Sequence, residues 1–115
     1  LHIHVPIKAR DEFKIVKQRA KELAEHFHEQ ALDLTIIEHR INKRGNKVFI
    51  DYLRNDYNMT AVAPYSLRAN KVAGIATPLT WQELKDKKIH AQSYTLANIH
   101  QRLAHIVDPW QVCIP

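Results

Sequence analysis

The feature that most constrains the fold is a long stretch with helical spacing between Asp11 and Ala31. Its apolar residues recur three and four positions apart, which places them on one side of a helix. They are Phe13, Val16, Ala20, Leu23, Ala24, Phe27 and Ala31. Lysines and glutamates occupy the opposite side. The pattern therefore predicts a surface helix that covers a core.

Segments with strand character flank this helix. Residues 1–7 alternate apolar and polar side chains, and Pro6 marks the end or an edge of that strand. Residues 48–53 are rich in β-branched and aromatic side chains and lie between polar turns, so they predict a central strand. Residues 60–67 predict a second extended segment that bends at Pro64 or lies on an edge. This order favours neighbouring antiparallel strands.

Two shorter helices are predicted in the last third of the chain. Thr80 is expected to cap the first, with Glu83 as its capping-box partner. Residues 95–106 predict the second, which Thr95 would cap and the Asp108-Pro109-Trp110 sequence would end. The whole pattern predicts an α+β fold with a mostly antiparallel sheet flanked by helices. Residues 1–115 are expected to form one unit.

Composition narrows the classes of function. The net charge of +5 favours an anionic partner, and the presence of only two glycines argues against a glycine-rich phosphate loop. A single cysteine cannot form an intramolecular disulfide, which indicates a reducing compartment and hence the cytoplasm. No apolar stretch approaches the length of a membrane span, so no membrane partner is expected.

Asp51 is the most unusual residue of the predicted central strand. An aspartate is disfavoured there by strand propensity and by burial, so it needs a compensating partner. That partner could be a metal ion, backbone donors, or a basic side chain such as Arg54 or Lys47. Arg68 follows the next extended segment, where it could lie beside Asp51 at one mouth of the sheet as a phosphate ligand.

A basic segment precedes this strand. Lys43 and Arg44 stand beside the Gly45-Asn46 pair, which predicts a turn that projects its charges outward. A solvated hairpin tip and a contact with a phosphate backbone explain the segment equally well. Trp81 and Trp110 are interpreted as core anchors. His2 and His4 share one strand face, where two exposed histidines are favoured over a metal pair.

Four stretches together resemble the primase-polymerase domain of bacterial ATP-dependent DNA ligase D, in the archaeo-eukaryotic primase superfamily. They are LHIHVP at 1–6, KRGNKVFIDYLRN at 43–55, TAVAPYSLRA at 60–69 and ATPLTWQEL at 76–84. Such domains carry two aspartates one residue apart, then a histidine in a strand, then a strand ending in aspartate. His2 and Asp51 match the second and third signatures. No Asp-x-Asp stands in these 115 residues, so we expect the C-terminal portion of such a domain.

The resemblance implies roles for individual residues. His2 would contact the nucleotide phosphates, Arg68 would help to hold the triphosphate, and Asp51 would ligate a divalent metal. Arg54 stands where some relatives carry an amide, and it is included among the nucleotide-binding candidates. Lys43 and Arg44 are candidates for contacts with the nucleic-acid backbone.

The resemblance also implies a function. The complete enzyme would add nucleotides to DNA ends during break repair, from nucleoside triphosphates and with two Mg²⁺ or Mn²⁺ ions. Because the first metal signature is missing, this chain alone is expected to be inactive. The alternative is a non-catalytic, basic DNA-binding or scaffold module. A homo-oligomer formed through an exposed sheet edge is a further expectation.

Overall fold

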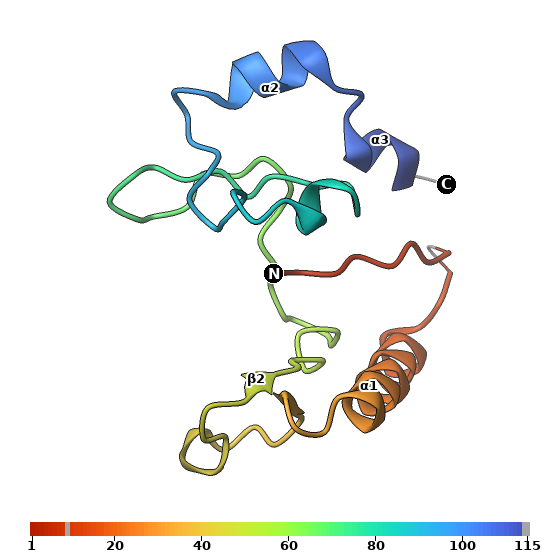
Figure 1. Ribbon diagram of the computed structural model, residues 1–115. Helices are drawn as coiled ribbons and strands as arrows, with labels where there is room; N and C mark the ends of the chain where they lie inside the picture. The colour runs from red at the N-terminus through yellow and green to blue at the C-terminus, as the bar shows by residue number, and fades with distance from the viewer. Residues whose placement is uncertain (9, 114–115) are drawn as a thin grey trace. The chain divides into compact units, whose positions relative to one another are not determined.

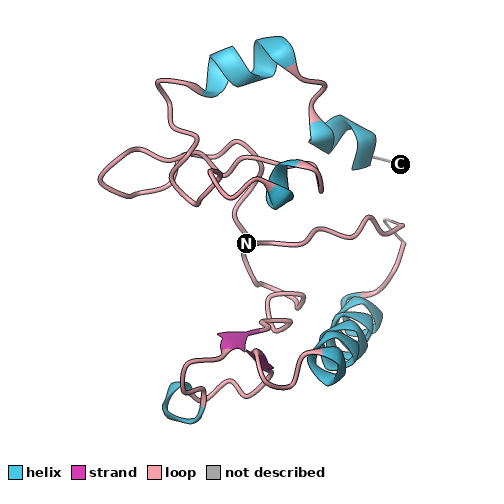
Figure 2. Cartoon of the chain, in the orientation of Figure 1, coloured by secondary structure: helices cyan, strands magenta, loops and turns pink. Residues whose placement is uncertain are grey.

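The computed structural model describes residues 1–8 and 10–113, which fall into two compact units (Figure 1). One unit is Lys8–Ala61, and the other combines Leu1–Ile7 with the chain from Val62 onward. Helices and short strands both occur, so the α+β class is confirmed (Figure 2). The assignment of residues 1–115 to a single unit stays a prediction.

Helix α1 (Phe13–Gln30) is the longest element and confirms the helical pattern of the sequence. Ala24 on its apolar side is buried, and Phe13 meets Tyr57 edge to face at 5.6 Å between ring centroids. An ion pair between Lys17 and Asp56 joins the helix to the segment after the second strand. The helix therefore packs against the remainder of its own unit through a few contacts along its length, including His28 near its end, whose Nδ1 lies 3.0 Å from Thr35 Oγ1.

The only sheet in the described part of the chain is a parallel pair, so the expectation of a mostly antiparallel sheet was wrong. Strand β1 (Thr35–Ile36) pairs with β2 (Val48–Phe49). The chain between them includes the 3₁₀ turn η1 (Ile41–Lys43) and reverses at Gly45, whose φ of 57° favours glycine. The turn at Gly45 was therefore predicted correctly, but it lies inside a crossover between parallel strands instead of closing a hairpin.

Other predicted strands are shorter than expected or absent. Residues 1–7 are extended without forming a strand, and β2 ends at Phe49, before Asp51. Within 60–67 only Leu67 pairs, through an isolated antiparallel bridge to Ile75. These segments lack the neighbouring strands that would complete a ladder, and Tyr65 in the last of them departs from an extended backbone with a φ of 60°.

The unit that begins with Leu1–Ile7 contains three short helical elements, η2 (Glu83–Lys85), α2 (Ile99–His105) and α3 (Pro109–Cys113). The predicted capping box before η2 is present. Thr80 Oγ1 accepts the Glu83 N–H at 3.1 Å, and Glu83 Oε2 accepts the Thr80 N–H at 2.8 Å. One expectation further along was wrong, because Asn98, not Thr95, is the residue before α2. The helix ends before Asp108-Pro109-Trp110 as expected, but that sequence also starts the unexpected α3, where Asp108 accepts the Trp110 N–H at 2.9 Å.

Apolar burial is sparse throughout the described residues. Ala24 and Ile99 are the only buried apolar side chains among them, whereas many large apolar side chains stay exposed. None of the helices described is long and apolar enough to cross a membrane. Polar contacts consequently account for much of the local order in both units.

Candidate functional site

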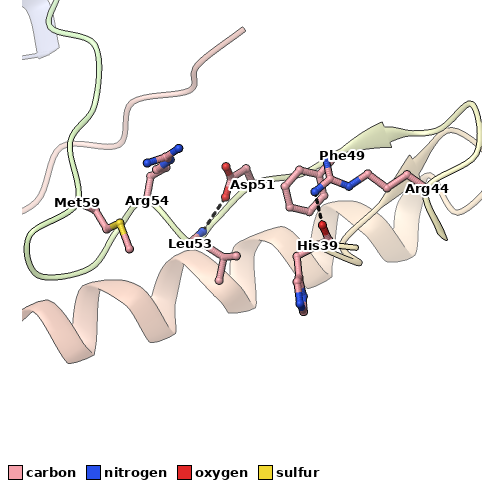
Figure 3. Close-up of a pocket in the computed structure, with 7 residues that line it drawn as sticks. All are labelled: His39, Arg44, Phe49, Asp51, Leu53, Arg54 and Met59. Atoms are coloured by element: carbon pink, nitrogen blue, oxygen red, sulfur yellow. Dashed lines mark hydrogen bonds between the residues drawn. The ribbon is translucent and has the colours of Figure 1, made fainter. Parts of the chain in front are cut away.

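Asp51 lines a pocket of about 370 Å³ in the Lys8–Ala61 unit (Figure 3). It is exposed just beyond β2, and its Oδ1 accepts the Leu53 N–H at 3.0 Å. No ion pair of the described residues joins it to Arg54 or Lys47, and the ammonium of Lys47 donates to the Leu32 carbonyl at 2.7 Å. Of the partners considered from sequence, the structure therefore shows a backbone donor.

Arg44 lines the same pocket. Its guanidinium lies 3.7 Å from the centroid of the Phe49 ring, and its Nε donates to the Glu38 carbonyl at 3.2 Å. A further N–H of Arg44 donates to the His39 carbonyl, as Figure 3 shows. Arg44 is therefore held against its own unit, while the neighbouring Lys43 is exposed.

The carboxylate of Glu38 stabilises the chain beside this pocket. Its Oε1 accepts the Arg40 N–H at 3.0 Å. That backbone hydrogen bond is the main reason the pKa of Glu38 lies below its usual value, and the nearby positive charges of His39, Lys43 and Arg40 act in the same direction. Glu38 thus stays ionised and reduces the positive charge of the basic segment at this end.

A second pocket, of about 660 Å³, lies in the unit that begins with Leu1–Ile7. His2 and Arg68 both line it, as does Asn70. The side chain of Arg68 is exposed. Its backbone N–H donates to the Gly74 carbonyl at 2.7 Å, which holds the backbone in place at Arg68. Two of the residues for which the resemblance implies phosphate contacts therefore line one pocket.

Both tryptophans of the chain line this second pocket as well. Trp110 is half-buried and meets the His4 ring edge to face at 5.1 Å. Trp81 is 71% exposed, so its interpretation as a core anchor was wrong. The Thr80 capping box directs the chain into η2, and the indole of Trp81 stays at the surface of the pocket.

Sequence reasoning missed a buried ionic cluster behind the second pocket. The Arg102 guanidinium holds both carboxylate oxygens of Glu83 at 2.9 and 3.0 Å and donates to the Pro78 carbonyl at 2.8 Å. It also lies 4.9 Å from the centroid of the Tyr94 ring. The signal was available, because Arg102 follows Ile99 by three positions on the apolar side of the predicted helix.

Tyr65 extends this buried polar region. Its hydroxyl donates to Asp108, immediately before α3. Burial and the hydrogen bond to Asp108 raise the pKa of Tyr65 to about 12. Because Tyr65 precedes Arg68 by three residues, the cluster anchors the segment that carries Arg68.

The six candidate residues fall in different units. Asp51 and Arg54 share the first pocket with Arg44, whereas His2 and Arg68 share the second. Lys43 lies in η1. The described residues contain no group of three or more histidine, cysteine, aspartate or glutamate side chains that could hold a metal ion. Asp51 therefore supplies one carboxylate, and these residues do not form a complete metal site.

Comparison with known proteins gives consistent results. The family model for the LigD primase-polymerase domain matches residues 1–110. The multifunctional non-homologous end joining protein LigD of Pseudomonas aeruginosa is 30% identical over 112 residues, which are 96% of this chain and 13% of that protein. The LigD DNA repair protein of Mycobacterium tuberculosis H37Rv is 31% identical over 94 residues, 82% of this chain and 12% of that protein.

A solved structure shows the same likeness in three dimensions. The polymerase domain of Mycobacterium tuberculosis ligase D, in complex with DNA, superposes with a TM-score of 0.85 at 26% identity. The match covers 94% of this chain and 37% of the solved chain. The chain thus spans a small part of the full-length relatives and little more than a third of the solved domain. Since the family model matches nearly all of it, the chain belongs to the LigD primase-polymerase domain family of non-homologous end joining repair proteins.

Proposed function

We propose that this chain forms the triphosphate-binding part of a DNA-end nucleotidyltransferase. One observation carries the proposal: His2 and Arg68, far apart in sequence, line a single pocket. The family match over residues 1–110 supports it, since nucleotide addition requires a site for a nucleoside triphosphate. In this proposal the chain binds and orients the substrate for chemistry that needs further residues.

The side chains of the second pocket suit a polyphosphate. An arginine presents several N–H donors in a planar fork that matches phosphate oxygens, and none of the ion pairs among the described residues uses Arg68. His2 lines the same pocket and adds an imidazole to the phosphate contacts. Arg54, in the other unit, is proposed as a secondary nucleotide contact.

Asp51 is proposed as one ligand of a divalent ion, Mg²⁺ or Mn²⁺. Divalent metals favour carboxylate oxygens, and the carboxylate of Asp51 is exposed. A single carboxylate binds such ions weakly, and the remaining ligands would come from outside this chain. We therefore expect no template-dependent primer extension by the purified chain with either ion. Extension that Asp51→Ala abolishes would contradict this expectation.

DNA ends are the proposed second substrate. The solved relative is a polymerase domain in complex with DNA. In this chain the exposed Lys43 is proposed to meet the DNA backbone, because lysine and arginine commonly contact phosphates, and its neighbour Arg44, which is held within its own unit, is the second candidate. A cytoplasmic location remains our proposal on the basis of the single cysteine.

Triphosphate binding is tested on the chain by itself. Both tryptophans line the second pocket, so their fluorescence should report ATP binding directly. Arg68→Ala should weaken ATP binding by about tenfold or more, since a hydrogen bond to a charged group contributes roughly 1.5–3 kcal/mol. Lys71→Ala is the matched control, because Lys71 is exposed in the same unit and does not line the pocket. Equal losses in both variants would reject the pocket as the site.

A non-catalytic DNA-binding module is the second candidate function. The absence of a three-residue metal-ligand group among the described residues, together with the net charge of +5, favours it. An experiment that measures DNA binding in the presence of ATP distinguishes the two functions. In a simple DNA-binding module, ATP should leave the affinity for duplex DNA unchanged. In part of a nucleotidyltransferase, ATP and a primer end should bind to the chain together.

A further inference from the structure

Arg68 begins a tight turn that carries a second polar side chain to the same pocket. The chain pairs Leu67 with Ile75 and reverses between them. At the start of the turn, the Asn70 N–H donates to the Arg68 carbonyl at 2.8 Å, as in a γ-turn. Arg68 and Asn70 both line the second pocket. The turn therefore holds the backbone of Asn70 directly beside that of Arg68.

The side chain of Asn70 has a fixed orientation. Its Oδ1 accepts the Gly74 N–H at 2.9 Å. A backbone N–H can only donate, so the oxygen is the amide atom that faces it, and the NH₂ group keeps both of its donors. The amide also lies close against Gly74, because a Cβ added at this glycine would be 3.0 Å from Asn70 Nδ2. Glycine thus leaves the space in which the amide of Asn70 is held.

The NH₂ group of Asn70 is available to a ligand. None of the hydrogen bonds within the described ranges uses its Nδ2, and the residue is exposed. Other polar groups that line the pocket are occupied, since the Thr77 hydroxyl donates to the Ile75 carbonyl at 3.2 Å and His90 Nδ1 accepts the Gln92 N–H at 3.2 Å. Asn70 therefore contributes a neutral donor group that is both oriented and unoccupied.

We propose that Asn70 is a phosphate-binding residue of the second pocket, which donates its amide N–H groups to oxygens of the triphosphate beside the guanidinium of Arg68. The inference rests on the proposed function, because it names a further residue of the same site. An amide NH₂ group offers two donors and carries no charge, so it can bind phosphate oxygens without repelling Arg68. Gly74 acts indirectly, because its N–H holds the amide oxygen and leaves the NH₂ group for the ligand.

Two substitutions of Asn70 separate phosphate binding from a purely structural role. Asn70→Asp retains an oxygen that can accept the Gly74 N–H, but it replaces the donors with a carboxylate, whereas Asn70→Ala removes both. Amide hydrogen exchange at Gly74 should therefore stay slow in Asn70→Asp and become faster in Asn70→Ala. The affinity of the full chain for ATP, measured by tryptophan fluorescence, should fall about fivefold in Asn70→Ala and about tenfold or more in Asn70→Asp.

Ala69→Asp is the matched control for the added negative charge. Ala69 is the exposed neighbour of Asn70 and does not line the pocket. A carboxylate at this position should weaken ATP binding by less than about threefold, because solvent and salt screen a charge that lies outside the site. The difference between Asn70→Asp and Ala69→Asp therefore measures the loss of the donors at the site itself.

The order of the two Asn70 variants decides the proposal. If Asn70→Asp binds ATP as the unaltered chain does and only Asn70→Ala is weaker, Asn70 merely shapes the turn and the proposal fails. Equal losses in Asn70→Asp and Ala69→Asp would also overturn it. A loss in Arg68→Ala without any loss at Asn70 refutes this inference alone, whereas unchanged ATP binding in Arg68→Ala refutes the proposed function as well.

Discussion

Two arginines in the unit that begins with Leu1–Ile7 use the same side chain in opposite ways. The side chain of Arg102 is only 6% exposed, and Glu83, the Pro78 carbonyl and the Tyr94 ring surround it. Arg68 is exposed at the second pocket and takes part in no ion pair of the described residues. The protein neutralises the charge of Arg102, whereas the charge of Arg68 is available to an anion.

The difference shows how an arginine that stabilises the fold can be distinguished from one that can bind a ligand. Taking a guanidinium out of water has a large free-energy cost, so a buried one requires a carboxylate with good geometry. Glu83 meets this requirement with two oxygens, of which Oε2 also accepts the Thr80 N–H. An arginine at a pocket surface needs no such partner, since water solvates it until a ligand arrives. The comparison can be tested at both residues.

Replacing each arginine by alanine should give the largest difference, in the free energy of unfolding. Arg102→Ala should lower the free energy of unfolding of its unit by about 3 kcal/mol, at the lower end for breaking a buried pair, because Glu83 keeps some exposure. Arg68→Ala should change it by less than about 0.5 kcal/mol. Urea unfolding followed by tryptophan fluorescence measures both, because both tryptophans lie in this unit. Equal losses would break the comparison.

A conservative variant sharpens this result. Arg102→Lys retains the charge but cannot hold both oxygens of Glu83 in a planar fork. It should therefore recover only part of the stability that Arg102→Ala loses. Full recovery would mean that charge alone, without the bidentate geometry, stabilises the cluster.

The next largest effect is a loss of stability at high pH, which we expect from Tyr65. Burial and the hydrogen bond to Asp108 raise the pKa of Tyr65 to about 12, from an ordinary value of 10.0. A group whose pKa is raised by folding contributes stability that is fully present below its unfolded pKa and is lost as the pH rises. The unit should therefore lose stability between pH 10 and about 12. Tyr65→Phe should remove this dependence, and an unchanged alkaline profile in that variant would contradict the assignment.

A smaller effect is expected in acid, at Glu83. Burial alone would raise the pKa of this carboxyl, but the Thr80 N–H and the Arg102 guanidinium outweigh burial and lower it below 4.5. The corresponding stability is present above the unfolded pKa of about 4.5 and is lost as the pH falls through the lower folded value. Unfolding measured from pH 6 downward should show this loss. Glu83→Gln should be less stable at pH 6 and flatter in its pH dependence.

The sequence predicted the local features of the fold well. The α1 pattern and the Thr80 capping box depend on residues three or four positions apart, and both are confirmed. The sheet was predicted wrongly. β2 pairs with β1 in parallel through a crossover connection, and the spacing of apolar residues in the sequence does not reveal such a connection. Residues 1–7 show the alternation of a strand but are not assigned to one, because strand pairing depends on long-range contacts that no local rule supplies.

The candidate sites follow the same division between local and long-range information. Motif resemblance pointed to His2 and Arg68 separately, and the structure places both at one pocket. The exposure of Trp81 and the burial of Arg102 depend on tertiary packing, and neither was predicted. The roles of all six candidate residues, His2, Arg68, Asp51, Arg54, Lys43 and Arg44, stay predictions.

The contrast between a held and an available cation recurs in the other unit, at neighbouring residues. Arg44 lies over Phe49 and donates to the carbonyls of Glu38 and His39, whereas Lys43 is exposed. If the proposed DNA contact is made by the available cation, Lys43→Ala should reduce the slope of log affinity against log salt by about 1 and leave folding unchanged. The measurement is a titration of a short duplex from low to physiological salt.

Arg44→Ala is the matched comparison for this smallest effect. It should leave the salt slope nearly unchanged, because the guanidinium is already engaged by its own unit, and it should instead loosen the loop between β1 and β2. Amide exchange in residues 38–47 would detect that loosening. Equal reductions of the slope in Lys43→Ala and Arg44→Ala would show that both cations reach phosphate. In that case the contacts of Arg44 within its unit must be given up when DNA binds, and the distinction between the two residues fails.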